Sequence, residues 1–357
     1  MSTDARAERT PQSVLVTGGA GFIGSAFVRH ALAASPETRV VTLDALTYAG
    51  LRANLDGLAH ADRHTFVEGD IRDTALVARL LREHDVDTLV HFAAESHVDR
   101  SIDGPQAFVE TNVLGTQSLL DAARAAWTGR DDVRFHHVST DEVYGDLPPD
   151  AAPFTEDTPY APSSPYAASK AGSDHLVRAA FRTHGLPVTL SNCSNNYGPR
   201  QYPEKLIPVA ITRALAGEPI PVYGDGRQRR DWLHVDDHCA AVWRVLEAGQ
   251  PGRTYNVGGD AEVENRVLLA DLCETLDRLA PDRGPVPHAA LLTPVPDRPG
   301  HDRRYAIDSR RLQTELGWAP SVSLAQGLEA TVRWYLANDS WLAAVADERR
   351  QRDGVEA

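Results

Sequence analysis

A glycine-rich turn near the N-terminus constrains the fold of this chain more than any other feature. The segment TGGAGFIGS lies between an apolar run at residues 13–17 and a helical pattern at residues 22–35. Gly18, Gly21 and Gly24 permit a tight turn and let backbone N–H groups approach a pyrophosphate at the start of the helix. A strand, a turn and a helix in this order predict a dinucleotide-binding unit.

Strand and helix patterns alternate along the first half of the chain. The further strands are predicted at residues 39–44, 64–70, 87–94, 133–140 and 186–193, and the further helices at 74–85, 105–127 and 166–185. Such alternation is typical of a parallel sheet with helices on both faces, joined by right-handed crossovers. We therefore predict an α/β fold, a Rossmann-type doubly wound parallel sheet with a smaller C-terminal substrate-binding lobe.

The alternation becomes looser after about residue 195, which suggests a division into domains. We assign residues 13–195 to an NAD-binding Rossmann domain, to which parts of the later chain return, and residues 196–340 mainly to the substrate lobe. Residues 146–165 carry many prolines and are expected to form an irregular loop. Residues 1–12 and 341–357 are expected to be terminal extensions, with a frayed end from residue 347.

Charge and cysteine content exclude several classes of partner. The 357 residues include 36 Lys and Arg against 50 Asp and Glu, a net charge of −14, which disfavours nucleic acid. Cys193, Cys239 and Cys273 are far apart, so they suggest neither a disulfide framework nor a metal site. The sequence shows no apolar signal core and no run long enough to cross a membrane. We expect a cytoplasmic protein without a membrane partner.

An acidic residue after the second predicted strand indicates which dinucleotide would bind. Asp44 follows Gly21 by 23 positions. A carboxylate there accepts hydrogen bonds from the ribose hydroxyls of adenosine and repels a 2′-phosphate, which favours NAD over NADP. Asp70 and Ile71 end the third strand, where the adenine ring would lie. A packing role for this pair is an equally good interpretation.

A tyrosine and a lysine lie one turn apart on the helix predicted from residue 166. Tyr166 and Lys170 would emerge on one face. An ammonium beside a phenol favours the phenolate, so the pair could act as a general base on a sugar hydroxyl. Lys170 and Lys205 are the only two lysines in the chain, among 34 arginines. In a chain that otherwise uses arginine as its basic residue, a lysine suggests a position where arginine cannot replace it.

Two adjacent carboxyl groups follow the fifth predicted strand. Asp141 and Glu142 would lie at the carboxyl edge of the sheet, where ligands of such folds bind. Crowding of like charges and partial burial would raise at least one of the two pKa values and leave an acid and a base side by side. The alternative is an acidic pair that only stabilises the start of a helix.

Several motifs in order identify a family. TGGAGFIGS, DALTYAG, AAESHVDRSI, STDEVYGDLP, SPYAASKAGSDHLVRA, NCSNNYGPRQYPEKLIP and DRPGHDRRYAID together resemble the dTDP-glucose 4,6-dehydratases, members of the extended short-chain dehydrogenase/reductases. The resemblance covers about residues 13–340. It implies a hydro-lyase with tightly bound NAD, which converts dTDP-glucose to dTDP-4-keto-6-deoxyglucose in deoxysugar biosynthesis.

The resemblance also implies roles for five catalytic residues. Tyr166, paired with Lys170, takes the proton of the glucose 4-hydroxyl while hydride passes from C4 to NAD⁺, and Thr140 shares that hydrogen bond. Glu142 removes the C5 proton, which the 4-ketone has made acidic. Asp141 protonates the departing 6-hydroxyl as water leaves. Hydride then returns to C6, and Glu142 returns a proton to C5.

Binding residues are carried over from the same motifs. The expected cofactor contacts are Gly18, Gly21, Phe22, Ile23, Gly24, Asp44, Ala45, Leu46, Thr47, Asp70, Ile71, Phe92, Ala93, Ala94, Glu95, Thr111, Tyr166, Lys170 and Asn196. The expected substrate contacts are Ser96, Thr140, Asn195, Lys205, Leu206, Pro221, Val222, Tyr223, Arg230, Asn265, Asp297, Arg298, Pro299, Gly300 and His301. One departure is Ala45, where relatives often carry lysine. Its effect would be confined to the solvent side of the adenosine.

Two other functions share part of this pattern. A nucleotide-sugar 4-epimerase uses the same tyrosine–lysine pair and tight NAD but does not need Asp141 and Glu142. A catalytically silent regulator could bind NAD and sugar nucleotides without turnover, although the intact catalytic set disfavours it. The family further implies a homodimer, with residues 105–127 and 166–184 as its interface. The motifs do not distinguish between two uses of the product, a cell-wall deoxysugar and the glycosylation of a secondary metabolite.

Overall fold

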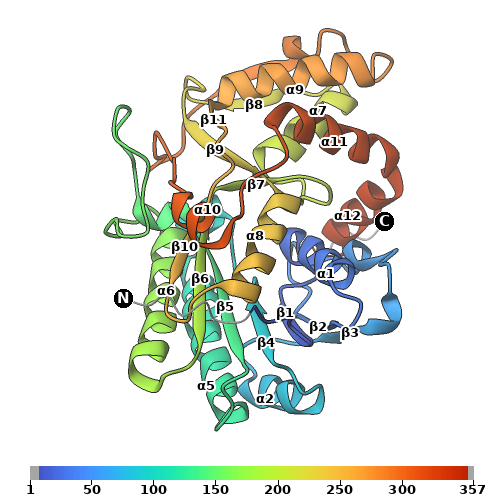
Figure 1. The fold of residues 1–357 in the computed structure, drawn as a ribbon. Helices are drawn as coiled ribbons and strands as arrows, with labels where there is room; N and C mark the ends of the chain where they lie inside the picture. The colour runs from blue at the N-terminus through green and yellow to red at the C-terminus, as the bar shows by residue number, and fades with distance from the viewer. Residues whose placement is uncertain (1–7, 353–357) are drawn as a thin grey trace.

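Seven parallel strands form the main sheet of the protein (Figure 1). The structure, a computed structural model, describes residues 8–352. The strands are β1 (Ser13–Thr17), β2 (Arg39–Asp44), β3 (His64–Glu68), β4 (Thr88–His91), β5 (Arg134–Thr140), β6 (Val188–Cys193) and β10 (Thr254–Val257). Their order is β10-β6-β5-β4-β1-β2-β3, with every neighbouring pair parallel. This confirms the predicted doubly wound sheet.

Helices cover both faces of this sheet. Helices α2 (Thr74–Glu83), α5 (Thr116–Ala126) and α6 (Pro165–His184) pack on one face, and α1 (Phe22–Ala34) and α8 (Val235–Ala248) on the other. Within β1, Leu15 belongs to the first hydrophobic layer, whereas Val14 and Val16 belong to the second. Because successive strand residues point to opposite faces, the central residues of β1, which is buried on both sides, are apolar at successive positions.

A second lobe covers the carboxyl edge of the sheet, at the top of Figure 1. It contains α7 (Leu206–Ala216), α9 (Asn265–Leu279), α11 (Leu324–Ala337), α12 (Asp339–Arg352), β7 (Asn195–Tyr197), β8 (Ile220–Tyr223), β9 (Arg229–His234), β11 (Glu262–Glu264) and β12 (Leu292–Val295). The short helices α3 (Val98–Asp103), α4 (Pro105–Phe108) and α10 (Arg310–Leu316) lie nearer the main sheet. Within the described ranges, no helix is long and apolar enough to cross a bilayer.

The chain after residue 195 contributes to both lobes. β10 pairs with β6 and adds the last strand of the main sheet, while α8 packs on α1. At the C-terminal end, Trp341 and Val345 are buried in the core of the second lobe, and α12 remains helical to Arg352. The frayed end expected from residue 347 therefore does not begin there. Residues 1–7 and 353–357, parts of the expected extensions, lie outside the described residues.

The helix predicted over residues 105–127 is interrupted. The structure has α4, then a wide π-helical turn at Val109–Gly115, then α5. At the centre of this turn the side chain of Asn112 accepts a hydrogen bond from Glu95 N (2.9 Å) and donates to Ser169 Oγ (2.8 Å). Such turns occur mostly where a side chain has a function. Apolar periodicity could not reveal it, because both forms bury nearly the same face.

We predict that Gly24→Ala destabilises the protein. A Cβ at Gly24 would lie 2.1 Å from the carbonyl oxygen of Gly18, so the turn between β1 and α1 would have to move. Overpacking of this kind costs about 1–3 kcal/mol, measurable as the free energy of unfolding in urea. Gly104→Ala is the control, since its Cβ would meet Arg100 O only at 3.8 Å. Equal stability of the two variants would contradict the prediction.

Candidate active site

One cavity of about 540 Å³ lies between the carboxyl edge of the main sheet and the C-terminal lobe. Its walls come from the ends of β1, β2, β4, β5 and β6, from the first turns of α1 and α6, and from loops of the second lobe. Parallel strands place their carboxyl ends at one edge, which is where α/β folds bind ligands. The cavity brings together segments that are widely separated in the sequence.

Most of the residues predicted from the sequence line this cavity. They include the proposed catalytic residues Thr140, Asp141, Glu142, Tyr166 and Lys170. The cofactor candidates on the wall are Gly18, Gly21, Phe22, Ile23, Gly24, Asp44, Ala45, Thr47, Asp70, Ile71, Phe92, Ala93, Ala94, Glu95, Thr111 and Asn196. The substrate candidates on the wall are Ser96, Asn195, Lys205, Leu206, Pro221, Val222, Tyr223, Arg230, Asn265, Arg298, Gly300 and His301.

Three predicted contacts, Leu46, Asp297 and Pro299, are not among the lining residues. The backbone N–H of Leu46 donates to Asp44 Oδ1 (2.8 Å), so this residue supports the carboxylate from behind. The Asp297 carboxylate accepts from Gln228 Nε2 (2.9 Å) and lies 2.6 Å from His301 Nδ1. Asp297 therefore fixes the loop that carries Arg298 and His301, and Pro299 belongs to the same loop.

The glycine turn forms one end of the cavity from backbone alone. A Cβ at Gly18, where φ is +69°, would lie 2.6 Å from Ala93 N, so β1 and β4 approach too closely for a side chain. Asp44 Oδ2 accepts a hydrogen bond from Ala20 N (2.9 Å), which ties the turn to the end of β2. The start of α1 at the cavity wall and the glycines before and within its first turn fit the diphosphate of a dinucleotide.

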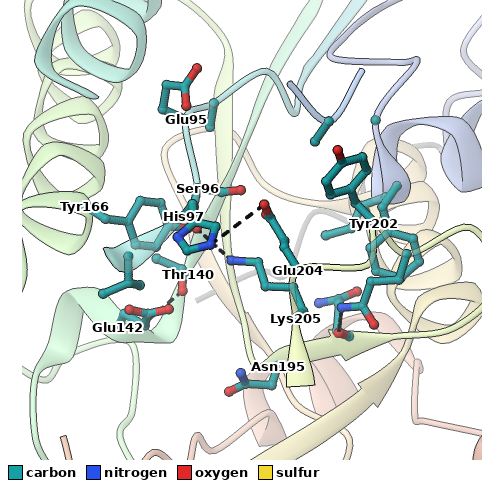
Figure 2. A pocket seen from close by; sticks show the side chains of 18 of the residues that line it. Glu95, Ser96, His97, Thr140, Glu142, Tyr166, Asn195, Tyr202, Glu204 and Lys205 are labelled. Carbon is teal, nitrogen blue, oxygen red and sulfur yellow. Dashed lines mark hydrogen bonds and ion pairs between the residues drawn. The ribbon is translucent and has the colours of Figure 1, made fainter. Parts of the chain in front are cut away.

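The two adjacent carboxyl groups follow β5 in a 3₁₀ turn, Asp141–Tyr144. Thr140 caps this turn, because its Oγ1 accepts from Glu142 N (3.3 Å) and donates to Asp141 Oδ1 (3.4 Å). Figure 2 shows Tyr166, Thr140 and Glu142 lying together on one wall of the cavity. The turn therefore places both carboxyl groups in the wall of the cavity that Tyr166 also lines.

Burial separates these two carboxyl groups from ordinary surface acids. Asp141 is 2% exposed, and desolvation with the charges of Glu142 and Asp231 raises its pKa well above the usual value. Burial also raises the pKa of Glu142, but the cations Lys205 and Arg230 act in the opposite direction. The environment therefore keeps Asp141 protonated more strongly than Glu142. An acid next to a stronger acid is the arrangement that an elimination of water requires.

Tyr166 and Lys170 are buried on the first turns of α6. Ser164 caps this helix by accepting from Ala167 N (3.1 Å), and Lys170 Nζ donates to the carbonyl of Val138 (2.9 Å). The sequence predicted that Lys170 would lower the pKa of Tyr166. In the structure burial raises the pKa of Tyr166 well above its usual value, and Glu142 adds to this effect. Desolvation is the largest cause of this rise, so an unassisted phenol at this position stays protonated.

Three cations line the other end of the cavity. Lys205 Nζ donates to Ser96 O (2.9 Å), an interaction drawn in Figure 2. Arg230 is 6% exposed, stacks 4.2 Å from the Tyr305 ring centroid and donates to the carbonyl of Asp302 (2.8 Å). Arg298 pairs with Asp99 at the rim (3.1 Å). These side chains are held in place, so they offer a local basic patch within an acidic protein.

Three amide oxygens in the wall have no protein partner within the described residues. Asn195 Oδ1, Gln201 Oε1 and Asn265 Oδ1 are buried and accept no hydrogen bond. Buried polar atoms are rarely left unpaired, so such atoms in a cavity point to a ligand. Asn196 differs, because its Oδ1 lies 2.8 Å from His238 Nδ1. No group of three metal-ligating side chains is present among residues 8–352.

Some lining residues were not predicted. Glu204 lies 3.2 Å from Tyr48 OH and 3.9 Å from His97 Nε2, next to Lys205 (Figure 2). Tyr305 stacks on Arg230 at the far wall. Their positions beside Lys205 and inside the DRPGHDRRYAID motif could have indicated them. Tyr48 and His97 depend on the loops after β2 and β4, whose paths no local pattern determines.

Comparisons with known proteins agree with this geometry. The profile of the GDP-mannose 4,6 dehydratase family matches residues 15–331. A dTDP-glucose 4,6-dehydratase of Xanthomonas campestris pv. campestris (strain B100) is 57% identical over 338 residues, covering 93% of this chain and 95% of that protein. The dTDP-glucose 4,6-dehydratase of Salmonella typhimurium (strain LT2) is 51% identical over 342 residues, covering 92% and 94% of the two chains.

Solved structures give the same result. DesIV, a dTDP-glucose 4,6-dehydratase from Streptomyces venezuelae crystallised with NAD and TYD bound, has a TM-score of 0.85 and 51% identity, covering 92% of this chain and 98% of that one. A UDP-glucose 4-epimerase from Thermotoga maritima has a TM-score of 0.79 at 28% identity, covering 91% and 99%. By sequence motifs, fold and identity over nearly its whole length, the chain belongs to the dTDP-glucose 4,6-dehydratase family.

Proposed function

We propose that this protein converts dTDP-glucose to dTDP-4-keto-6-deoxyglucose. The observation that carries the proposal is the pair of a buried Asp141 and a half-buried Glu142 beside Tyr166 in one cavity. A 4-epimerase moves a hydride and a proton at C4 alone, so it has no use for this pair. Elimination of water between C5 and C6 needs both a base and an acid, and the two carboxyl groups supply them.

The glycine turn, Asp44 and the wall after β4 would hold NAD. DesIV and a Bacillus anthracis relative with 42% identity and a TM-score of 0.82, which covers 92% of this chain and 98% of that one, were both crystallised with NAD. When bound, NAD⁺ would accept a hydride from the sugar and return it later, so no net reduced cofactor forms. Asp44, hydrogen-bonded to Ala20 N and Leu46 N, is fixed where ribose hydroxyls would donate to it.

The proton transfers are assigned to side chains of this chain. As a phenolate stabilised by the positive charge of Lys170, Tyr166 Oη takes the proton of the 4-hydroxyl, with Thr140 Oγ1 sharing the hydrogen bond. The ketone formed at C4 acidifies the C5 proton, which the Glu142 carboxylate removes. Asp141, held protonated by burial and like charge, gives its proton to the 6-hydroxyl, which leaves as water. Glu142 then returns a proton to C5.

Lys205, Arg230 and Arg298 are proposed to hold the diphosphate of the sugar nucleotide. Their charges lie at one end of the cavity, in a chain whose net charge of −14 would otherwise repel the substrate. Charge-assisted hydrogen bonds from such groups are stronger than neutral ones.

We also propose that residues 13–195 mainly bind the cofactor and residues 196–340 mainly the substrate, since the cavity lies between these two parts.

We further propose a homodimer formed through residues 105–127 and 166–184. Val109 and Leu114, on the π-helical turn, are 48% and 55% exposed. Large apolar side chains exposed on one segment support an interaction surface.

We also propose that the protein lies in the cytoplasm, and the state of its cysteines supports this. Its three cysteines, Cys193, Cys239 and Cys273, are buried free thiols, as suits a reducing compartment.

Incubation of the purified protein with dTDP-glucose tests the proposed reaction. The expected product is lighter than the substrate by one water, and no NADH accumulates at completion. Recovery of dTDP-galactose instead would identify an epimerase. Tight binding of the sugar nucleotide without any product would identify a regulator without turnover.

We predict that Glu142→Gln separates oxidation from elimination. The amide cannot take the C5 proton, so incorporation of solvent deuterium at C5 should fall by about 10²-fold or more, whereas C4 oxidation still occurs. Mass spectrometry of the sugar and absorbance of transient NADH measure the two steps. Glu274→Gln, on the exposed side of α9, is the control. Normal deuterium incorporation in Glu142→Gln would show that another group is the base.

The two lysines should respond differently to replacement by arginine. Lys170 is buried against the carbonyl of Val138, where a planar guanidinium does not fit, so Lys170→Arg should lower kcat by about tenfold or more. Lys205→Arg should mainly raise KM, because its proposed role is binding of the diphosphate. Steady-state kinetics with dTDP-glucose measures kcat and KM for both variants. A raised KM in Lys170→Arg together with a lowered kcat in Lys205→Arg would contradict the two assigned roles.

Asp141→Asn should stabilise the folded protein increasingly as the pH rises from 5 to 8 while abolishing turnover. Burial raises the pKa of Asp141, so between its unfolded and folded values the unfolded chain loses the proton first. Stability of the wild type is therefore lost as the pH rises through this range, and the neutral amide avoids that loss. Melting temperatures from pH 5 to pH 8 should show a growing advantage of the variant. A constant difference would contradict the raised pKa.

A further inference from the structure

Four polar side chains on α6 are spaced by four residues. They are Tyr166, Lys170, Asp174 and Arg178, a phenol followed by alternating charges. Residues four apart lie on one face of a helix, and this face points to the main sheet. Lys170 is 4% exposed and Asp174 is fully buried. The proposed reaction uses the first two residues of this row and leaves Asp174 without a role.

Asp174 is surrounded by hydrogen-bond donors from other elements. Ser139 Oγ on β5 (3.0 Å) and Tyr160 OH in the preceding loop (2.8 Å) both donate to its Oδ2. Oδ1 lies 3.1 Å from His137 Nε2, also on β5. Burial raises the pKa of Asp174 above its usual value, whereas the charge of Lys170 and the two hydroxyl donors act in the opposite direction and favour the carboxylate. Arg178 reinforces the shell, since its guanidinium donates to Tyr160 OH (2.7 Å).

The tautomer of His137 follows from its neighbours. The hydroxyl of Ser173 donates to the carbonyl of Lys170 (2.8 Å), so its proton is not available to the imidazole. His137 Nδ1 has no partner among the described residues, whereas Nε2 faces Asp174. We therefore assign the proton to Nε2, which donates it to Ser173 Oγ (3.3 Å), while Asp174 Oδ1 lies 3.1 Å away and accepts no hydrogen bond. Burial and the nearby Lys170 lower the pKa of His137 well below its usual value, so the ring is neutral.

Lys170 has several other titratable neighbours, and none offers a negative charge near neutral pH. His91 on β4 and His137 on β5 are buried, and burial lowers both pKa values well below normal. Burial raises the pKa of the Cys193 thiol on β6 to about 12 and that of Tyr166 well above normal. Within the described chain, Asp174 is thus the neighbour that can act as counter-ion to the Lys170 ammonium.

We propose that Asp174 is a positioning residue that keeps Lys170 protonated and directed at the site of C4 oxidation. Burial alone would favour the neutral amine, and a neutral amine could not stabilise a phenolate on Tyr166. The carboxylate, one turn further along α6, offsets this cost by its charge. The importance of Lys170 for catalysis rests on the proposed function. The effect of Asp174 on the charge of Lys170 does not.

Because the chain contains only two lysines, the charge of Lys170 can be measured directly. Lysine labelled with ¹³C and ¹⁵N in the full-length protein gives two side-chain NMR signals, and Lys205→Arg assigns them. Asp174→Asn keeps the size and the acceptor atom but removes the charge. The titration midpoint of Lys170 should fall by about one pH unit or more, and that of Lys205 should stay unchanged.

Turnover gives a second readout. In Asp174→Asn the alkaline limb of the kcat profile should move to lower pH with the Lys170 midpoint, with KM for dTDP-glucose changed by less than about threefold. Asp174→Glu, which retains the charge, should restore most of the profile. Glu156→Gln is the matched control, because Glu156 is a carboxylate with a 4% exposed side chain near Arg311 and outside the cavity.

An unchanged Lys170 midpoint in folded Asp174→Asn would overturn the proposal. A lowered midpoint with unchanged turnover would support it and instead refute the proposed role of Lys170 in catalysis. If Asp174→Asn does not fold, the Lys170 signal of the wild type should still show an acidic inflection as Asp174 takes a proton. Ser139→Ala removes one donor and should move that inflection to higher pH. The absence of any inflection would also overturn the proposal.

Discussion

Removal of water from the carboxyl edge of the sheet is the constraint on which the site depends. Burial raises the pKa values of Asp141, Glu142 and Tyr166 and lowers that of Lys170, so every one of these groups is pushed towards its neutral form. Catalysis needs some of them charged. Neighbouring charges must therefore favour the ionised form of selected groups. The cations near Glu142 favour its carboxylate, and the carboxylate of Asp174 favours the ammonium of Lys170.

The central strands supply the framework for this selective effect. On β5, His136 lies between Thr189 Oγ1 (2.9 Å) and Ser191 Oγ (3.0 Å) of β6. On β4, His91 lies between Thr17 Oγ1 (2.8 Å) and Thr116 Oγ1 (3.0 Å). A layer of satisfied polar side chains inside an otherwise apolar sheet is rigid, because each group would be costly to leave unpaired. The catalytic turn after β5 rests directly on this layer.

Local sequence patterns predicted most of the framework for identifiable reasons. The strands β1 and β2 are short, mainly apolar runs bounded by turns, and the four-residue spacing of Tyr166 and Lys170 places both on one helical face. Local sequence patterns were less informative where a side chain forms hydrogen bonds with other elements of the fold. The π-helical turn at Val109–Gly115 depends on Asn112 meeting Glu95 and Ser169 from other elements. The protonated state of Tyr166 depends on burial, which spacing does not express.

The sequence by itself determined the glycine turn, the acidic residue after β2, the order of strands and helices and the candidate catalytic groups. Each of these follows from residues close together in the chain, where local geometry decides the outcome. Only the tertiary structure decided the protonation of Asp141 relative to Glu142, the supporting role of Asp297 and the buried shell of Asp174. Desolvation and Coulomb interactions depend on distances between segments that the chain brings together only on folding.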